Sequence, residues 1–287
     1  MSNKSSIIET MSKRQSIRTF NTKNISESHY QLINEYINNQ NSLAGPFGGK
    51  SKIELVQVIN NVTDKGIKLG TYGFIKNARA YLVGIAENSK YPLLDFGYCF
   101  HTLVLYLTEL GLGTCWMGGT FSRNSFEKEI QIGVGEFIPG ITPIGYPSQK
   151  QRVVDKALRY AVKADNKKSW EKLFYDESFE VSLAKENAGE WEIPIEMVRI
   201  GPSASNKQPW RLVLSGDRSV CHFYIEHTPN YSSKLGYDMQ LLDMGIAMCQ
   251  FDLACKELNM NGQWVSYDPN IGHTNKHIEY IVSWKKE

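Results

Sequence analysis

Two stretches of the chain are apolar on nearly every side of a helix, and they share one frame. They read LLDFGYCFHTLVLYLTELGLGTCW from Leu93 and LLDMGIAMCQFDLACKELNMNGQW from Leu241. Leu241 follows Leu93 by 148 positions, and Trp264 follows Trp116 by the same 148. One register across 24 positions indicates an internal duplication. A helix that is apolar all round belongs in the centre of a core, so we expect two long buried helices.

Shorter patterns flank each long helix in the same order. Segments at 28–40 and 194–200 predict helices that end at Gly-Pro, because glycine suits a helix C-cap and proline cannot continue the helix. Runs of β-branched and aromatic residues predict strands that start near Ala78, Val220 and Ile278. Each half is therefore expected to form a helix, two strands, a long buried helix and a further strand.

This order of elements predicts an α+β fold of two similar halves, with mixed sheets and long central helices. The charged stretch from Gln149 to Trp170 lies between the two copies and is expected to be a crossover or linker. We place the N-terminal half at residues 1–165 and the C-terminal half at residues 166–287. The halves are expected to pack through their long helices into one body.

Composition narrows the classes of partner. The net charge of the 287 residues is +2, and the basic residues are spread along the chain, which argues against a nucleic-acid footprint. No stretch reaches the ~18 apolar residues of a membrane-spanning helix, and the first residues lack the apolar core of a signal peptide, so we expect no membrane partner and a cytoplasmic location. The five cysteines lack a C-x-x-C pair and are expected to be buried thiols, and no histidine spacing indicates a metal site.

The first segment with candidate chemistry is KRQSIRTF, which contains Arg14, Ser16 and Arg18. If it is a helix that opens after Ser12, the two arginines are four residues apart and share a face. Two guanidinium groups and a hydroxyl at a helix N-terminus suit a phosphate group. The alternative is a basic turn exposed to solvent.

The second segment is RIGPSASNKQPW, from Arg199 to Trp210. A helix C-cap and a turn would explain Gly-Pro-Ser without a functional role. The density of hydrogen-bonding groups at Ser203, Ser205 and Asn206 goes beyond that need, and such groups suit the edge of a planar heterocycle. A third segment, GLGTCWMGGTF, lacks the spacing of a dinucleotide fingerprint, but its glycine pair would let the backbone approach a ligand.

Together these segments resemble the nitroreductase family of FMN-dependent oxidoreductases. The motifs that carry the resemblance are R-x-S-x-R, P-S-A-S-N-x-Q-P-W, G-L-G-T-C-W-x-G-G and P-I-G-Y-P. The resemblance extends over essentially the whole chain when the chain is divided into two family-like halves. It is strongest to the branch in which the domain is duplicated within one polypeptide.

In that family two subunits intertwine and bind FMN at their interface, with R-x-S-x-R from one subunit and P-S-x-x-N from the other. The resemblance therefore implies a monomer that acts as its own pseudo-dimer, with further association left open. It implies one FMN per chain, because GPFGGK replaces the polar loop in the first half and no second arginine motif follows it. A basic residue near Lys167 or Lys168 would contact the phosphate, with Arg152 and Arg159 as substitutes. The cofactor-binding residues implied by the resemblance are Arg14, Ser16, Arg18, Gly118, Gly119, Lys167, Lys168, Pro202, Ser203, Ala204, Ser205, Asn206 and Gln208.

The activity implied is transfer of hydride from NADH or NADPH through FMN to a small electron-poor acceptor such as a nitroaromatic compound or a quinone. No side-chain catalytic residue is implied, because the flavin carries the chemistry. Two alternatives stay open. One is a flavin-binding protein without turnover, such as a sensor or carrier, and the other is a structural protein whose site has decayed.

Overall fold

The computed structural model describes residues 5–58, 71, 73–149, 166–233 and 235–287. The chain separates into an N-terminal unit within residues 13–162 and a C-terminal unit within residues 1–12 and 163–287. The first helix, α1 (Ile7–Lys13), lies in the C-terminal unit as far as Ser12, and there the Ile8 backbone N–H donates to Glu257 at 2.9 Å. The expected boundary between residues 165 and 166 falls at the edge of a stretch outside the described residues.

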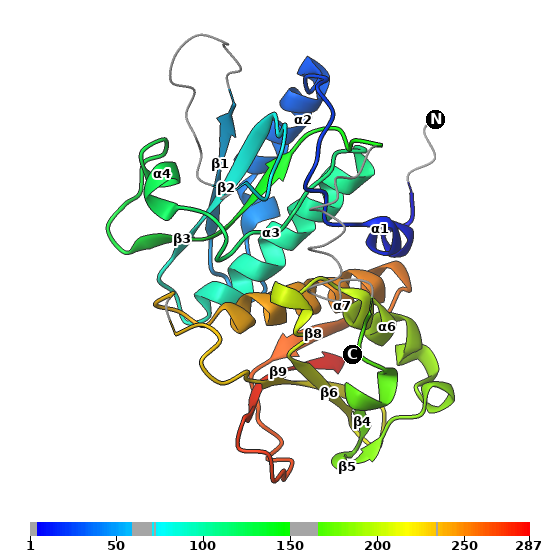
Figure 1. Cartoon of the computed structure of the whole chain (residues 1–287). Helices are drawn as coiled ribbons and strands as arrows, with labels where there is room; N and C mark the ends of the chain where they lie inside the picture. The colour runs from blue at the N-terminus through cyan, green and yellow to red at the C-terminus, as the bar shows by residue number, and fades with distance from the viewer. Residues whose placement is uncertain (1–4, 59–70, 72, 150–165, 234) are drawn as a thin grey trace. The chain divides into compact units, whose positions relative to one another are not determined.

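The N-terminal unit contains a three-stranded antiparallel sheet in the order β1–β2–β3. The central strand is buried at every position except its last, and the long helix α3 lies along one face of the sheet (Figure 1). Most residues of α3 are buried, as its apolar pattern predicted. The elements are α2 (Glu27–Asn38), β1 (Ser51–Gln57), β2 (Ala80–Glu87), α3 (Pro92–Glu109), α4 (Arg123–Glu127) and β3 (Glu136–Ile144).

The C-terminal unit contains a six-stranded mixed sheet in the order β5–β4–β6–β7–β9–β8. The β4–β6 pair is parallel, and the other pairs are antiparallel. The long helix α7 packs on this sheet with α6 beside it (Figure 1). The elements are β4 (Phe174–Asp176), β5 (Ser178–Ser182), α6 (Glu192–Ile200), β6 (Trp210–Leu214), β7 (Val220–Glu226), α7 (Met239–Glu257), β8 (Gly262–Val265) and β9 (Ile278–Lys286).

The two units repeat the same order of elements. Helix α2, strands β1 and β2, helix α3 and strand β3 correspond to α6, β6, β7, α7 and β9. In each sheet the second of the three corresponding strands, β2 or β7, lies between the other two and is antiparallel to both. The α+β fold and both long helices expected from the sequence are therefore confirmed. The expected helices at 28–40 and 194–200 are confirmed with boundaries shifted by one or two residues.

The two long helices end in the same way. After α3, Gly111 N–H donates to the Thr108 carbonyl and Leu112 N–H donates to the Leu107 carbonyl. After α7, Asn259 and Met260 make the same pair of bonds to Lys256 and Cys255. Both patterns are Schellman caps, which need a left-handed residue, and here Gly111 has φ 72° and Asn259 has φ 58°. These residues are 148 positions apart, so the duplication extends to the caps.

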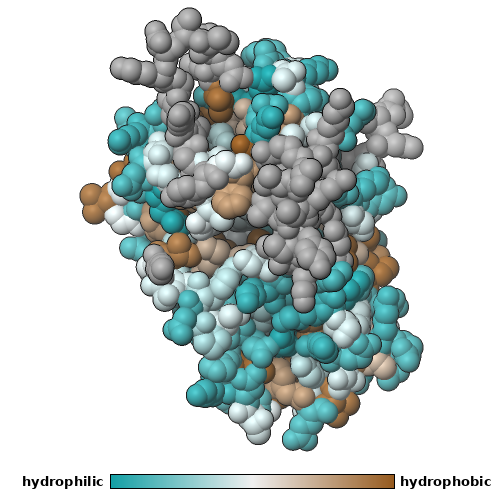
Figure 2. Space-filling view, viewed as in Figure 1, coloured by the Kyte–Doolittle hydropathy of each residue, from teal (hydrophilic) through white to brown (hydrophobic). Residues whose placement is uncertain are grey.

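The described surface is mainly polar. Hydrophilic residues cover much of the visible face, and hydrophobic residues are exposed in small patches (Figure 2). Among the described residues, no helix combines the length and apolar character needed to cross a bilayer. All five cysteines are buried thiols, as the sequence predicted.

Candidate functional site

The segment with the two arginines is extended and does not form a helix. Helix α1 ends at Lys13, so the expected helix over Arg14 to Arg18 is wrong. The backbone N–H of Ile17 donates to the Thr114 carbonyl at 2.7 Å, and the Arg18 carbonyl accepts from Lys76 N–H at 2.9 Å. These partners are far along the sequence, and the local i, i+4 spacing of the arginines gave no sign of them.

Extended backbone still groups the three predicted side chains. Residues two apart on an extended chain point to the same side, so we expect Arg14, Ser16 and Arg18 to share a face. Ile17 points the other way and packs against Gly113 and the core of the N-terminal unit. The three residues of R-x-S-x-R are therefore still expected on one side of the segment, because side chains alternate along extended backbone.

The arginine segment meets two motifs that lie far from it in the sequence. Gly113 N–H donates to the Gly145 carbonyl at 2.8 Å, which joins GLGTCW to IGYP. Asn21 N–H donates to the Tyr146 carbonyl at 2.9 Å, and Ser148 N–H donates to the Thr19 carbonyl at 3.1 Å. The arginine segment, the glycine segment and IGYP thus form one layer of hydrogen-bonded backbone.

The glycine pair lies at the edge of this layer. Arg123 of α4 donates to the Gly118 carbonyl at 2.7 Å and to the Ile138 carbonyl at 3.2 Å. Gly119 is exposed. The Gly118 carbonyl therefore already accepts an internal charged hydrogen bond, which fixes the conformation of this turn.

A buried histidine on α3 was not anticipated from the sequence. His101 is fully buried, and its Nδ1 lies 3.3 Å from Trp116 Nε1, which donates to it. Burial, and next the positive charge of Arg14, lower the pKa of His101 well below its usual value, so the ring is neutral. Arg14 therefore lies close enough to the buried helix to act on its electrostatics.

In the C-terminal unit, the loop at 201–208, the polar loop, has an unusual backbone. Ser205, Asn206 and Gln208 have φ of 49°, 54° and 48°. Left-handed backbone is uncommon outside glycine, and each such residue costs ~1 kcal/mol, so surrounding contacts must maintain it. Three such residues within four positions mark the loop as a site where shape is held against local preference.

Side chains around the polar loop supply those contacts. Gln208 N–H donates to Ser203 Oγ at 2.9 Å, and the Tyr231 hydroxyl donates to Ser205 Oγ at 2.9 Å. Lys167 Nζ donates to Asn206 Oδ1 at 3.2 Å and to the Gly201 carbonyl at 2.5 Å. The hydroxyls and the amide that the sequence suggested for reading a ligand are thus engaged in shaping the loop.

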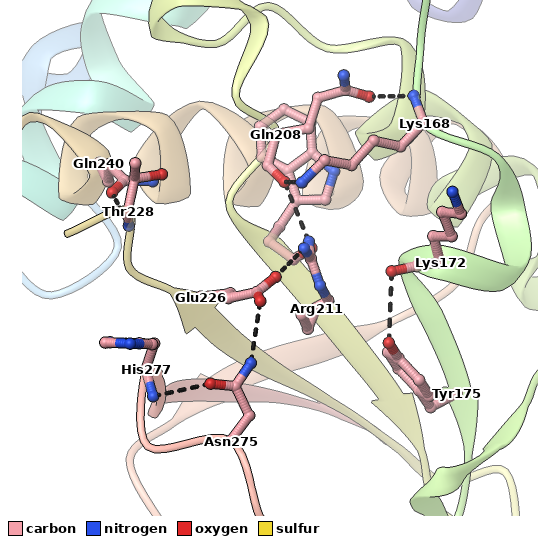
Figure 3. A network of polar contacts seen from close by, with 11 residues as sticks. Lys168, Lys172, Tyr175, Gln208, Arg211, Glu226, Thr228, Gln240, Asn275 and His277 are labelled. Atoms are coloured by element: carbon pink, nitrogen blue, oxygen red, sulfur yellow. Dashed lines mark hydrogen bonds and ion pairs between the residues drawn. The ribbon is translucent and has the colours of Figure 1, made fainter. Parts of the chain in front are cut away.

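Lys168 reaches the same loop from the segment that precedes β4. Its backbone N–H donates to Gln208 Oε1 at 2.9 Å, and its Nζ donates to the Gln208 carbonyl at 3.3 Å (Figure 3). Burial, and next the charge of Arg211, lower the pKa of Lys168 to about 8. The two lysines and the polar loop predicted from the sequence therefore come together, whereas Arg152 and Arg159 lie outside the described residues.

Beneath the polar loop, Arg211 of β6 forms a network that the sequence did not indicate. It is buried, pairs with Glu226 of β7 and donates to the Gln208 carbonyl at 3.1 Å. Asn275 donates to the other oxygen of Glu226 at 2.9 Å (Figure 3). The only sequence signal was an arginine inside an otherwise apolar strand, which is too common a feature to single out.

Comparison with known proteins identifies the family of this chain. Residues 6–255 match the family model described as "Putative TM nitroreductase". The chain belongs to this family. No curated protein matches the sequence.

One solved structure matches the fold over nearly the whole chain. A protein of Thermotoga maritima described as a putative nitroreductase is 17% identical, with a TM-score of 0.59, and the match covers 99% of this chain and 95% of that chain. An FMN-dependent nitroreductase of Clostridium difficile is 22% identical over 50% of this chain and 90% of its own, with a TM-score of 0.38. A nitroreductase of Desulfitobacterium hafniense with bound FMN is 16% identical over 53% and 96%, also at 0.38. The first match supports a nitroreductase-like fold over the full chain.

In this nitroreductase-family chain, the loop at 45–49, the twin loop, differs from the polar loop. Phe47 and Gly49 N–H donate to the two oxygens of Asp95 on α3, at 2.9 and 2.8 Å. Gly45 N–H donates to the Gly49 carbonyl at 2.9 Å, and Gly48 N–H donates back to Gly45 at 3.0 Å. The N–H groups of the twin loop are thus consumed internally, and Phe47 packs on Tyr91 with ring centroids 4.7 Å apart.

Proposed function

We propose that this nitroreductase-family protein is an FMN-dependent oxidoreductase that passes hydride equivalents from NADH or NADPH to a small electron-poor acceptor such as a nitroaromatic compound or a quinone. The observation that carries the proposal is the polar loop, where the left-handed residues Ser205, Asn206 and Gln208 are held by hydrogen bonds with Tyr231, Lys167 and Ser203 respectively. Backbone held against its preference is typical of ligand sites. Family membership supplies the class of chemistry.

The residues near both motifs fit a flavin phosphate and a planar ring. Arg14, Ser16 and Arg18 would hold the phosphate and ribityl chain, since guanidinium groups bind phosphate oxygens in pairs. The polar loop, with Lys167 and Lys168 behind it, would line the ring through its backbone. Bound FMN supplies hydride acceptance and onward electron transfer, whereas the residues of this chain bind and orient the reactants.

The environment of Arg14 favours an anionic ligand beside its guanidinium group. The guanidinium is partly buried, and its charge reaches the neutral ring of His101. A partly buried cation gains more from a bound phosphate than an exposed one, because the effective dielectric constant is lower. We therefore propose that an anionic group of the ligand binds beside Arg14.

An anaerobic titration tests this function directly. Purified protein is expected to be yellow, to lose its flavin absorbance on addition of NADH or NADPH, and to regain it when a nitroaromatic compound or quinone is added. Yellow protein that neither nucleotide bleaches would indicate a flavin-binding protein without turnover. Colourless protein that fails to bind added FMN would overturn the proposal.

A further inference from the structure

Asp243, in the second turn of α7, is a buried carboxyl group at the base of the polar loop. It is 2% exposed, and its Oδ1 accepts from the backbone N–H of Ala204 at 2.9 Å. Within the described part of the chain, no group donates to its Oδ2. A buried ionised oxygen without a donor is costly, so this oxygen needs a proton or a partner supplied from elsewhere.

Its counterpart, Asp95, shows what a completed carboxylate looks like in the same fold. Asp95 is 148 positions earlier, equally buried at 2% exposure, and both of its oxygens accept backbone N–H groups. The twin loop wraps so closely that a Cβ at Gly45 or Gly49 would collide with the Asp95 side chain. The polar loop makes one bond to its carboxyl group where the twin loop makes two. The duplication therefore kept the acid in both halves and left one oxygen without a backbone donor in the half that carries the polar motif.

The charges around Asp243 favour its protonated form. Burial raises its pKa to about 8, against the smaller lowering by Ala204 N–H and by Lys167, and the nearby carboxylate of Asp238 raises it further. Tyr231 is the other titratable group that interacts with it. At neutral pH the Oδ2 atom therefore carries a hydrogen and becomes a donor.

We infer that Asp243 is a neutral carboxylic acid whose Oδ2–H group donates a hydrogen bond to an acceptor atom of the ligand seated against the polar loop. The inference rests on the proposed function, in which that ligand is FMN, whose ring presents carbonyl oxygens and nitrogens as acceptors. A carboxylic acid kept neutral by its apolar site is an effective donor at neutral pH. Asp243 would then contact the cofactor, a role that is closed to its counterpart Asp95, whose two oxygens both accept from the twin loop.

The pH dependence of FMN affinity tests the inference with a matched pair of variants. Dissociation constants are measured from the recovery of flavin fluorescence between ~pH 6 and ~pH 10, the range that brackets this ionisation. The wild type should lose affinity on the order of tenfold as the pH rises, because the donor is lost and a negative charge replaces it. Asp243→Asn should show a clearly smaller fall, because the amide keeps an acceptor for Ala204 and presents N–H at every pH, so that only the loss of the Lys168 charge remains. Asp95→Asn should keep the wild-type profile.

A flat wild-type profile, or an equally large fall in Asp243→Asn, would overturn the inference. Infrared spectroscopy gives a second measurement that needs no folded variant. The wild type should show a protonated-carboxyl band at neutral pH that shifts on FMN binding and disappears as the pH rises; no such band, or one that FMN leaves unmoved, would equally overturn it. The infrared band separates this outcome from failure of the proposed function. Protein that binds no FMN would still show the protonated-carboxyl band.

Discussion

At the scale of single residues, the ammonium group of Lys168 lies near other positively charged side chains. Burial lowers the pKa of its ammonium group to about 8, and the positive charges of Arg211, Lys207 and Lys172 add to this effect. Glu226 offsets only part of this, and its carboxylate is already paired with Arg211. Such a lysine is poised to gain from an anionic ligand, because a bound negative charge would restore the favourable energy of its charged form.

This lysine predicts a specific pH dependence of stability. Between about 8 and the unfolded value near 10.5, the unfolded chain binds the proton more tightly than the folded chain, so the free energy of unfolding gains from Lys168 as pH rises. Lys168→Met should remove that gain, measured by urea denaturation at the two ends of the range. Lys185→Met, which removes a lysine from the surface of the same unit, corrects for the change in net charge. Parallel curves for wild type and Lys168→Met would contradict the assignment.

At the scale of elements, the sequence was most informative where a pattern is local. The long helices follow from apolar residues on all sides, and their repeat predicts both. The arginine segment misled because Arg14 and Arg18 match a helical spacing, while the partners that extend it, Thr114 and Lys76, are remote in sequence. Serine has no preference for left-handed backbone, so the conformation of Ser205 depends on contacts from Tyr231 and could not be predicted.

The paired Schellman caps give a prediction at this scale. Gly111→Ala should lower the free energy of unfolding by ~1 kcal/mol, because a Cβ in left-handed backbone is strained although no atom lies within 4 Å of its position. Asn259→Gly should raise it by a few tenths, since glycine removes the strain that asparagine bears at the same cap. Denaturant midpoints measure both. No loss of stability in Gly111→Ala, or a loss in Asn259→Gly, would show that the ends of α3 and α7 are not equivalent.

At the scale of the whole molecule, duplication produced two copies of each principal element but one copy of each motif that we propose binds flavin. The R-x-S-x-R motif occurs once, at Arg14 to Arg18, and the polar hydroxyl and amide loop occurs once, at 201–208. The N–H groups of the twin loop donate to Asp95 and to carbonyl groups of the loop itself. A second flavin site would have to displace these bonds and would lack an arginine motif, so the two halves have diverged in what they can bind.

This divergence predicts the flavin stoichiometry. Released FMN, measured against protein concentration after denaturation, should give one flavin per chain. Arg14→Ala should lose most of it, because removing one partner of a partly buried charge pair costs about 2 to 5 kcal/mol of binding. Phe47→Ser, which restores a hydroxyl to the twin loop, should leave the ratio at one, since Asp95 still holds the Phe47 and Gly49 N–H groups that a ligand would need. Two flavins in the wild type would show that the halves still bind as equals, and full retention in Arg14→Ala would show that Arg14 does not hold the phosphate.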